Sequence, residues 1–441
     1  MAYQEHLKTV VMIHKAIYNL GTKFRNPSLA FQLNQLNTSD KATYSELENI
    51  QTQKLKGLLS FAYEYSPYYH KIFHQLKLLP SDIQSLEDIQ KLPIIEKKDL
   101  LNHRSEIQSA AKFRKLVFSE TSGTTGQPLT IYRSEEWDSA TRAAMFRGMG
   151  WYGVKPWEKN GYLWGYNISN KEQNKIRLLD SLQNRFRLFS YSEDEMIIFL
   201  SNLKNARYLS GYSSMIYELA KRVNQMGMCG EFSELKMVKG TSEKIFDSYQ
   251  QEVKKAFGLP MISEYGSMES GLIAYECPEG HNMHIAMENV IVEEINGSAI
   301  VTNLCSHSFP IIRYRLGDAI ELADKEYRCT CGREHRVLKS VLGRVGKTII
   351  GEKRKYPSLT FYYVFKNIAL QKGLIANYQA IQNKPGQVLL KIEQPYSEAL
   401  DIGIKDELTK YFHDDVCFSI QYGSTLHKMD GKLRDFISEI E

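Results

Sequence analysis

Short apolar segments alternate with amphipathic segments along most of the chain, and this alternation limits the folds that it can adopt. From residue 116 onward, apolar runs such as "LVFSE" and "GYLWGY" are interspersed with segments of helical spacing, such as "SEEWDSATRAAMFRGMGW". Strands that alternate with helices typically form a parallel sheet covered by helices. The sequence therefore predicts an α/β fold in which β-sheets are layered with helices.

A smaller unit is expected at the C-terminal end. Its predicted elements are a strand at 377–383, a turn at 384–386, a strand at 387–395, a helix at 397–415 and a strand at 416–423. Two or three domains also fit a chain of 441 residues. We place the boundary near "LGRVG", which gives a large N-terminal domain at 1–342 and a small α+β domain at 343–441.

The N-terminal region is expected to form a helical scaffold. Residues 44–110 contain a long periodic segment that stops at Pro67. Ahead of it, a first amphipathic helix is indicated by apolar spacing at Leu7, Val10, Val11, His14, Ile17 and Tyr18. We expect this helix to dock on the core rather than on a membrane, because helices of globular proteins bury their apolar face.

Composition excludes several classes of protein. No apolar run approaches the roughly 18 residues that span a bilayer, and the N-terminus lacks a signal-peptide pattern, so a cytoplasmic location is expected. The net charge is +5 and both signs are interleaved, which does not indicate a nucleic-acid partner. A mild positive bias suits small anionic substrates. The sequence does not define the oligomeric state, and a dimer is compatible with it.

The loop "TSGTTG", residues 121–126, collects small hydroxylated residues and glycines. A glycine-rich turn between a strand and a helix can direct several backbone N–H groups at a phosphate, and hydroxyl groups add donors. The GxxxxGK[ST] pattern of P-loop NTPases is absent, since Gly123 and Gly126 are only three apart and Gln127 follows. Alone, the loop also fits an ordinary Ser/Thr/Gly turn.

Five further segments occur downstream in a fixed order: "GYSSMIYELA" at 211–220, "SEYGSMES" at 263–270, "IIRYRLGDAI" at 311–320, "VLGRVGK" at 341–347 and "STLHKMDGKLRDF" at 424–436. Together with "TSGTTG", they resemble the motifs of adenylate-forming enzymes, the acyl-CoA synthetases and their relatives. From about residue 55 on, the chain resembles the phenylacetate-CoA ligase and CapK subgroup. Members of this subgroup of the CapK type are associated with capsule and exopolysaccharide gene sets.

This resemblance implies an ATP-dependent, AMP-forming ligase with a large AMP-binding domain and a mobile C-terminal lid domain. A small carboxylic acid would be activated as an acyl-adenylate. CoA is the default acceptor of the acyl group, and an amine or hydroxyl of a capsule or exopolysaccharide sugar is the competing one. Aromatic residues such as Trp164 and Tyr166 could line the acid pocket or lie in the core.

The resemblance also assigns the site residues. The ATP phosphates would be held by Ser122, Gly123, Thr124, Thr125 and Gly126. Tyr265, followed by Gly266 and Ser267, would lie against the adenine, and Glu269 would hold Mg²⁺. Asp318 would accept hydrogen bonds from the ribose hydroxyls. Arg344 is assigned to the nucleotide contacts at the start of the pivot, and Lys432 is the catalytic lysine.

The sequence departs from the family pattern at several positions. Gly346 and Lys347 stand where the hinge usually has an Asp, Ser213 replaces a usual Pro, and Met268 replaces a usual Thr. The altered hinge leaves an alternative open: a non-catalytic protein of adenylate fold that serves in polysaccharide assembly. Retention of Glu269, Asp318 and Lys432 together favours the enzyme.

Cysteine and histidine residues gather in two short segments, "CPEGHNMH" and "CTCGRE". A Cys₃His set of Cys277, His284, Cys329 and Cys331 would suit tetrahedral Zn²⁺, and His281 is a competing ligand. Buried free thiols are the other interpretation. Similar Cys and His positions occur in parts of the phenylacetate-CoA ligase group, which favours a structural zinc that ties loops together.

Overall fold

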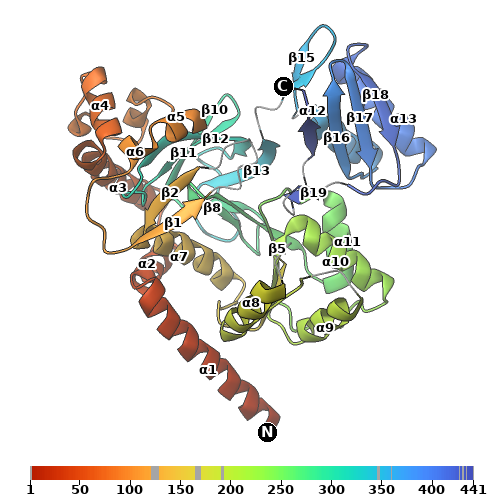
Figure 1. Ribbon diagram of the computed structural model, residues 1–441, viewed down its shortest axis with the longest axis horizontal. Helices are drawn as coiled ribbons and strands as arrows, with labels where there is room; N and C mark the ends of the chain where they lie inside the picture. Colours follow the sequence, from red (N-terminus) through yellow and green to blue (C-terminus); the bar gives the residue numbers. More distant parts are fainter. Residues whose placement is uncertain are drawn as a thin grey trace.

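A mixed sheet of eleven strands forms the centre of the computed structural model (Figure 1), which describes residues 2–120, 129–163, 170–189, 193–344, 348–358, 360–426, 428–429, 432–433 and 435–440. In spatial order its strands are β10 (Val290–Ile295), β11 (Ser298–Asn303), β12 (Ile311–Leu322), β13 (Val337–Arg344), β9 (Met283–Ile285), β8 (Gly271–Glu276), β7 (Met261–Ser267), β6 (Met237–Thr241), β5 (Tyr208–Tyr212), β3 (Asn160–Leu163) and β4 (Arg185–Arg187).

One half of this sheet is parallel and the other half is antiparallel. Strands β3 to β7 are parallel and alternate along the chain with helices α8 (Asn170–Leu182), α9 (Glu193–Leu203), α10 (Ser213–Gln225) and α11 (Asp247–Phe257). Strands β7 to β13 pair antiparallel. Helix α7 (Glu135–Trp151) packs on β8, where Gly148 lies against the ring of Tyr275. The α/β class predicted from the sequence is confirmed.

The N-terminal region of the chain is mostly helical. It contains α2 (Leu29–Thr38), α3 (Tyr44–Tyr65), α4 (Pro67–Leu76), α5 (Lys97–Asn102) and α6 (Arg104–Ile107), with 3₁₀ turns η1 (Pro80–Asp82) and η2 (Glu87–Lys91). Thr43 caps α3 by accepting from the Glu46 N–H, and the Glu46 carboxylate accepts from the Thr43 N–H, which fixes where this helix begins.

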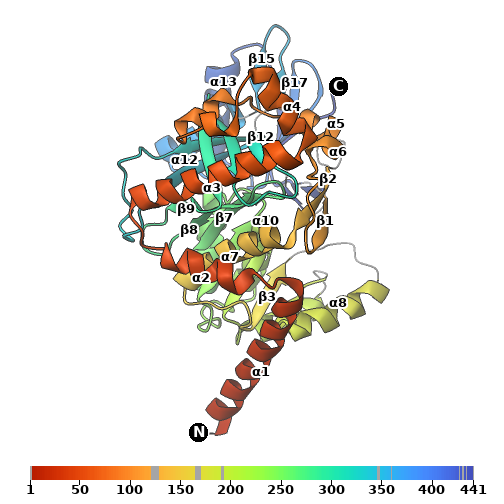
Figure 2. The same ribbon diagram turned by 90° about the vertical axis from the view of Figure 1, so that its left-hand side faces the viewer.

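Helix α1 (Ala2–Arg25) extends from one end of the molecule, as Figures 1 and 2 show. Its docking is partial. Tyr18 packs against Phe146 and Trp157, with ring centroids 6.1 and 5.9 Å apart, whereas apolar side chains on another face are exposed. The expectation that the first helix docks on the core therefore holds for one face only.

Strands β1 (Leu116–Glu120) and β2 (Thr130–Ser134) form a separate antiparallel hairpin, in which Glu120 pairs with Thr130. The loop of residues 121–126 thus joins two strands, and α7 begins only after β2. This connection differs from the turn between a strand and a helix that commonly holds a phosphate. Residues 121–128 themselves, with Ser122, Gly123, Thr124, Thr125 and Gly126, lie outside the described residues.

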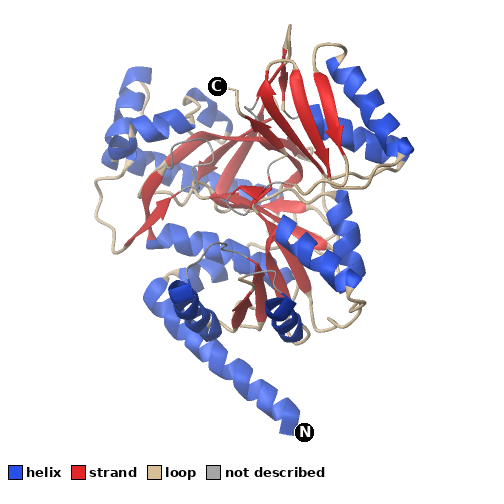
Figure 3. Ribbon diagram, turned by 45° about the vertical axis from the view of Figure 1, so that its right-hand side comes forward, coloured by secondary structure: helices blue, strands red, loops and turns tan. Residues whose placement is uncertain are grey.

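The C-terminal unit is a sheet accompanied by helices (Figure 3) and has a core of its own, built from residues between Ile349 and Phe436. Its sheet has the order β18 (Cys417–Gln421), β17 (Gln387–Ile392), β16 (Tyr378–Lys384) and β21 (Phe436–Ser438), covered by α12 (Thr360–Lys372) and α13 (Glu398–Phe412). Two small hairpins accompany it, formed by β14 (Thr348–Ile350) with β15 (Lys355–Pro357) and β19 (Lys428–Met429) with β20 (Lys432–Leu433). The sequence-based division after residue 342 falls inside β13.

A few polar contacts join the C-terminal unit to α10 and α11. The carboxylate of Glu393 accepts from the hydroxyl of Tyr217 at 3.0 Å and from the ammonium of Lys221 at 2.9 Å. Phe246 packs edge-on against Tyr378 beside them. Among the described residues, none of the helices is long and apolar enough to cross a membrane.

Candidate active site

The carboxyl ends of the central parallel strands lie side by side and carry polar side chains into the loops that follow. Strands β5, β6 and β7 end at Tyr212, Thr241 and Ser267. After β5, the Ser214 N–H at the start of α10 donates to the Glu243 carboxylate at 2.8 Å. Ligands of open α/β sheets bind at this edge, which makes it the candidate site.

Tyr265 and Asp318 come from strands far apart in the sequence and meet at this edge. The Tyr265 hydroxyl donates to an Asp318 carboxylate oxygen at 2.8 Å. Tyr265 lies near the end of β7, and Asp318 lies within β12. The structure therefore brings together the two residues that the sequence assigns to the adenine and the ribose.

Glu269 lies in the turn between β7 and β8 and is buried. The Tyr314 hydroxyl donates to its carboxylate at 3.3 Å, and the Asn303 amide donates to its main-chain carbonyl oxygen at 3.1 Å. These contacts hold both the backbone and the carboxylate of the residue that the sequence assigns to Mg²⁺.

The two tyrosine–carboxylate pairs form matching contacts. Tyr265 and Glu269 are four residues apart, as are their partners Asp318 and Tyr314 on β12, and the pairing runs in opposite directions along the chain. Tyr314 and Asp318 both reach these partners from β12, although the pairing of β12 with β11 shifts register between Arg315 and Ala319. The candidate nucleotide residues thus lie on two segments held in a fixed relative position.

Gly266 and Ser267 shape the turn between these segments. A Cβ atom at Gly266 would lie 2.4 Å from the carbonyl oxygen of Gly271, so the close approach of β7 and β8 requires glycine there. The hydroxyls of Ser267 and Ser270 are 2.8 Å apart, and the Ser270 N–H donates to Ser267 Oγ at 3.0 Å. The turn that carries Glu269 is therefore internally hydrogen-bonded.

The side chains of the other residues predicted for this site are not among those that the structure describes. Arg344 pairs with Asp318 in the β12–β13 ladder, but its side chain lies outside the described residues, as do hinge residues 345–347. Lys432 pairs with Met429 in the β19–β20 hairpin, and its side chain is likewise not described. Trp164 and Tyr166 also fall outside the described part of the chain.

A buried ion pair beside Tyr265 was missed by the sequence analysis. Lys239 in β6 donates to the Glu264 carboxylate at 2.6 Å, and the Thr241 hydroxyl donates to it at 3.2 Å. A lysine within the central strand "MVKGT" was the available signal, because a charged residue in a buried strand must be paired. Its partner could not be inferred, since it lies on the neighbouring strand.

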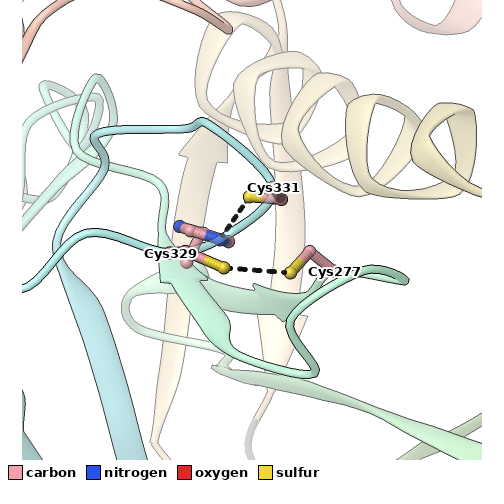
Figure 4. Close-up of side chains that lie close together, drawn as sticks. Cys277, Cys329 and Cys331 are labelled. Atoms are coloured by element: carbon pink, nitrogen blue, oxygen red, sulfur yellow. Dashed lines mark hydrogen bonds between the residues drawn. The ribbon is translucent and has the colours of Figure 1, made fainter.

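Cys277, His284, Cys329 and Cys331 converge next to the antiparallel half of the sheet (Figure 4). Their ligand atoms all lie within 4.8 Å of one another. The sulfur atoms of Cys277 and Cys329 are 3.7 Å apart, and Cys331 Sγ is 3.2 Å from His284 Nε2. Two thiolates on a tetrahedral Zn²⁺ are separated by about 3.8 Å, so the spacing suits this ion. His281 is exposed and contacts Glu276 instead.

The protonation states of this cluster suit a metal. Burial lowers the pKa of His284 to about 4, which leaves its imidazole neutral. His284 Nδ1 is 3.3 Å from the His335 carbonyl oxygen, which positions the proton on Nδ1 and frees Nε2 for a metal. Burial raises the pKa of the Cys277 thiol to about 12, and a bound cation would offset this cost of forming the thiolate.

Sequence comparison finds phenylacetate-coenzyme A ligase of Thermus thermophilus, 22% identical over 391 residues that cover 83% of this chain and 86% of the relative. Protein CapK of Staphylococcus aureus is 23% identical over 310 residues, which cover 68% of each chain. No protein-family model matches the chain.

The fold is also similar to solved structures. The structure of 2-hydroxyisobutyryl-CoA ligase in the postadenylation state, in complex with 2-HIB-AMP, has a TM-score of 0.70 at 15% identity and 91% coverage of both chains. The chain thus has the fold of this CoA ligase, and its sequence is similar to phenylacetate-coenzyme A ligase and to CapK.

Proposed function

We propose that the protein activates a small carboxylic acid with ATP, releases pyrophosphate, and passes the acyl group from the acyl-adenylate to an acceptor. The observation that carries this proposal is the paired arrangement of Tyr265 with Asp318 and of Glu269 with Tyr314 on two facing segments. It brings a ring, a carboxylate for ribose hydroxyls and a second carboxylate into one site.

We assign the acidic residues to the ribose and Mg²⁺, and the lysine to the reacting carboxylate and phosphate. The Asp318 carboxylate would accept hydrogen bonds from the ribose hydroxyls. Tyr265 would orient this carboxylate through its own hydroxyl, and its ring would lie against the adenine. Glu269 would hold Mg²⁺, which neutralises charge on the phosphates. The hydroxyls and amides of residues 122–126 complete the phosphate contacts. Lys432 would supply a mobile positive charge to the attacking carboxylate oxygen and the α-phosphate while pyrophosphate leaves.

The acceptor is proposed to be CoA, as the names of the relatives suggest. The likeness to CapK supports a second candidate, an amine or hydroxyl of a capsule or exopolysaccharide sugar. Both acceptors would consume the same acyl-adenylate, so they differ only in the second half-reaction.

We further propose that Cys277, His284, Cys329 and Cys331 hold a structural Zn²⁺. Four protein ligands leave no open coordination position, so the ion would join the loop after β8 to the segment before β13 and would take no part in the reaction. The donor set and its spacing support this assignment.

Acid-dependent exchange of labelled pyrophosphate into ATP tests the first half-reaction. The expected result is exchange with at least one acid from a panel, which Asp318→Asn weakens at limiting ATP concentrations. Hydroxylamine trapping then identifies the acid, and product analysis with CoA or with amino sugars identifies the acceptor. Nucleotide binding without exchange for every acid would instead support a non-catalytic protein of adenylate fold.

A further inference from the structure

Helix α1 has an apolar face that the described part of the chain leaves exposed. Tyr18 faces the body of the protein and packs on Phe146 and Trp157. The exposed fractions of Met12, Ile13, Leu20 and Phe24 are 69%, 53%, 60% and 78%. A phenylalanine so far in water is costly unless something else covers it.

The exposed residues form a continuous stripe. At about 100° per residue, Met12, Leu20, Ile13 and Phe24 fall within an arc of about 120° on the helix. Phe31, at the start of α2, is also exposed and extends the apolar surface beyond the end of α1. Helix α8 lies beside α1 and adds exposed Leu178, Leu179 and Leu182.

The charge of α1 indicates what covers this stripe. The helix has four cationic residues, Lys8, Lys15, Lys23 and Arg25, and a single carboxylate at Glu5. Of the cations with described side chains, Lys23 falls within the arc of the stripe, whereas Lys15 lies over the ring of Trp157. A second copy of the helix on the stripe would therefore cover the charge of Lys23 with apolar side chains. A surface of negative charge above an apolar interior complements both features.

We propose that α1 is an interfacial helix that binds the protein to an anionic lipid bilayer. Met12, Ile13, Leu20 and Phe24 insert at the boundary between headgroups and acyl chains, while Lys23 and its neighbours contact the lipid phosphates. The helix lies in the plane of the surface and need not span it. Tyr265, Glu269 and Asp318 of the candidate active site lie on other elements than α1.

Co-sedimentation of the full-length protein with vesicles tests this proposal. We expect binding to phosphatidylcholine vesicles that contain about one third phosphatidylglycerol, weaker binding to phosphatidylcholine alone, and a decrease as salt screens the charges. Leu20→Glu and Phe24→Glu should each weaken binding about tenfold or more, because each removes an inserted apolar side chain. Lys23→Glu should weaken binding to the anionic vesicles only.

Ile402→Glu is the matched control, since Ile402 is a half-exposed apolar residue on α13 of the C-terminal unit and should leave binding unchanged. Circular dichroism and pyrophosphate exchange of the variants verify that the fold and the active site are intact. Failure of the wild-type chain to bind either vesicle, or equal binding by Phe24→Glu, would overturn the proposal. So would a stable dimer that Leu20→Glu or Phe24→Glu dissociates, because a second copy would then cover the stripe.

Discussion

The Tyr265 hydroxyl donates to the carboxylate of Asp318 at 2.8 Å and so links β7 to β12, two strands that are not neighbours in the sheet. The hydrogen bond reaches Oδ2 and fixes the orientation of the carboxylate. A nucleotide that binds here would meet a carboxylate already held in position.

We predict that Asp318→Asn raises the KM for ATP in pyrophosphate exchange by about ten- to a hundredfold, because hydrogen bonds from hydroxyls to an ionised acceptor are lost. Tyr265→Phe keeps the ring and removes only the hydroxyl, and should raise the KM for ATP about fivefold. Equal effects of the two changes would show that Asp318 acts mainly through Tyr265.

Glu269→Gln should lower the rate of exchange at least about a hundredfold and raise the Mg²⁺ concentration needed for half-maximal activity. Tyr314→Phe is the matched control, since it removes a hydrogen bond to the same carboxylate without changing its charge. If Glu269→Gln had the same Mg²⁺ dependence as the wild type, Glu269 would not be a ligand of the metal.

The proposed zinc site predicts about one equivalent of zinc per purified chain. Cys277→Ser should abolish it and lower the first thermal unfolding transition by about 5 °C or more. His281→Ala should retain the metal, because His281 points away from the cluster. Elemental analysis and calorimetry measure both quantities, and less than about a tenth of an equivalent in the wild-type chain would contradict the assignment.

We expect the stability of the folded protein to depend on pH because of the buried carboxyl group of Glu288. Burial alone would raise the pKa of its carboxyl, but Arg147 and His335 outweigh burial and hold the pKa well below its ordinary value. A lowered folded-state pKa gives stability that is present above the pKa of the unfolded state, about 4.3, and is lost as pH falls toward the folded-state value.

Glu288→Gln should therefore destabilise the protein by about 3 kcal/mol near neutral pH, since Arg147 would be left buried without its partner. The difference from wild type should shrink below about pH 4, as the wild-type carboxylate becomes protonated. Urea unfolding across pH measures it. The exposed Glu326→Gln serves as control and should show little change at any pH.

Sequence reasoning reached the parts of the fold that local pattern determines. Helix α13 and strands β16 to β18 lie where the alternation placed them, because each buries a face with the period of its own element. The hairpin β1–β2 was missed, since its second strand has five residues, too few to separate from the start of a helix.

In the candidate site, too, the sequence predicted what local motifs carry and missed what tertiary contacts determine. Tyr265, Glu269 and Asp318 were found because short motifs carry them. Their hydrogen-bond partners could not be found from the sequence, since Tyr314 meets Glu269 only where the antiparallel half of the sheet brings β12 close to the β7–β8 turn. Contacts of that kind depend on tertiary structure and leave no local pattern.

Glu393 belongs to the small domain, yet two of its donors, Tyr217 and Lys221, belong to the large one. Rotation of the C-terminal unit away from α10 would separate the ammonium of Lys221 from the carboxylate of Glu393. Each charge would then lose this partner and would have to be hydrated by water. The balance between docked and undocked arrangements should consequently respond to ionic strength.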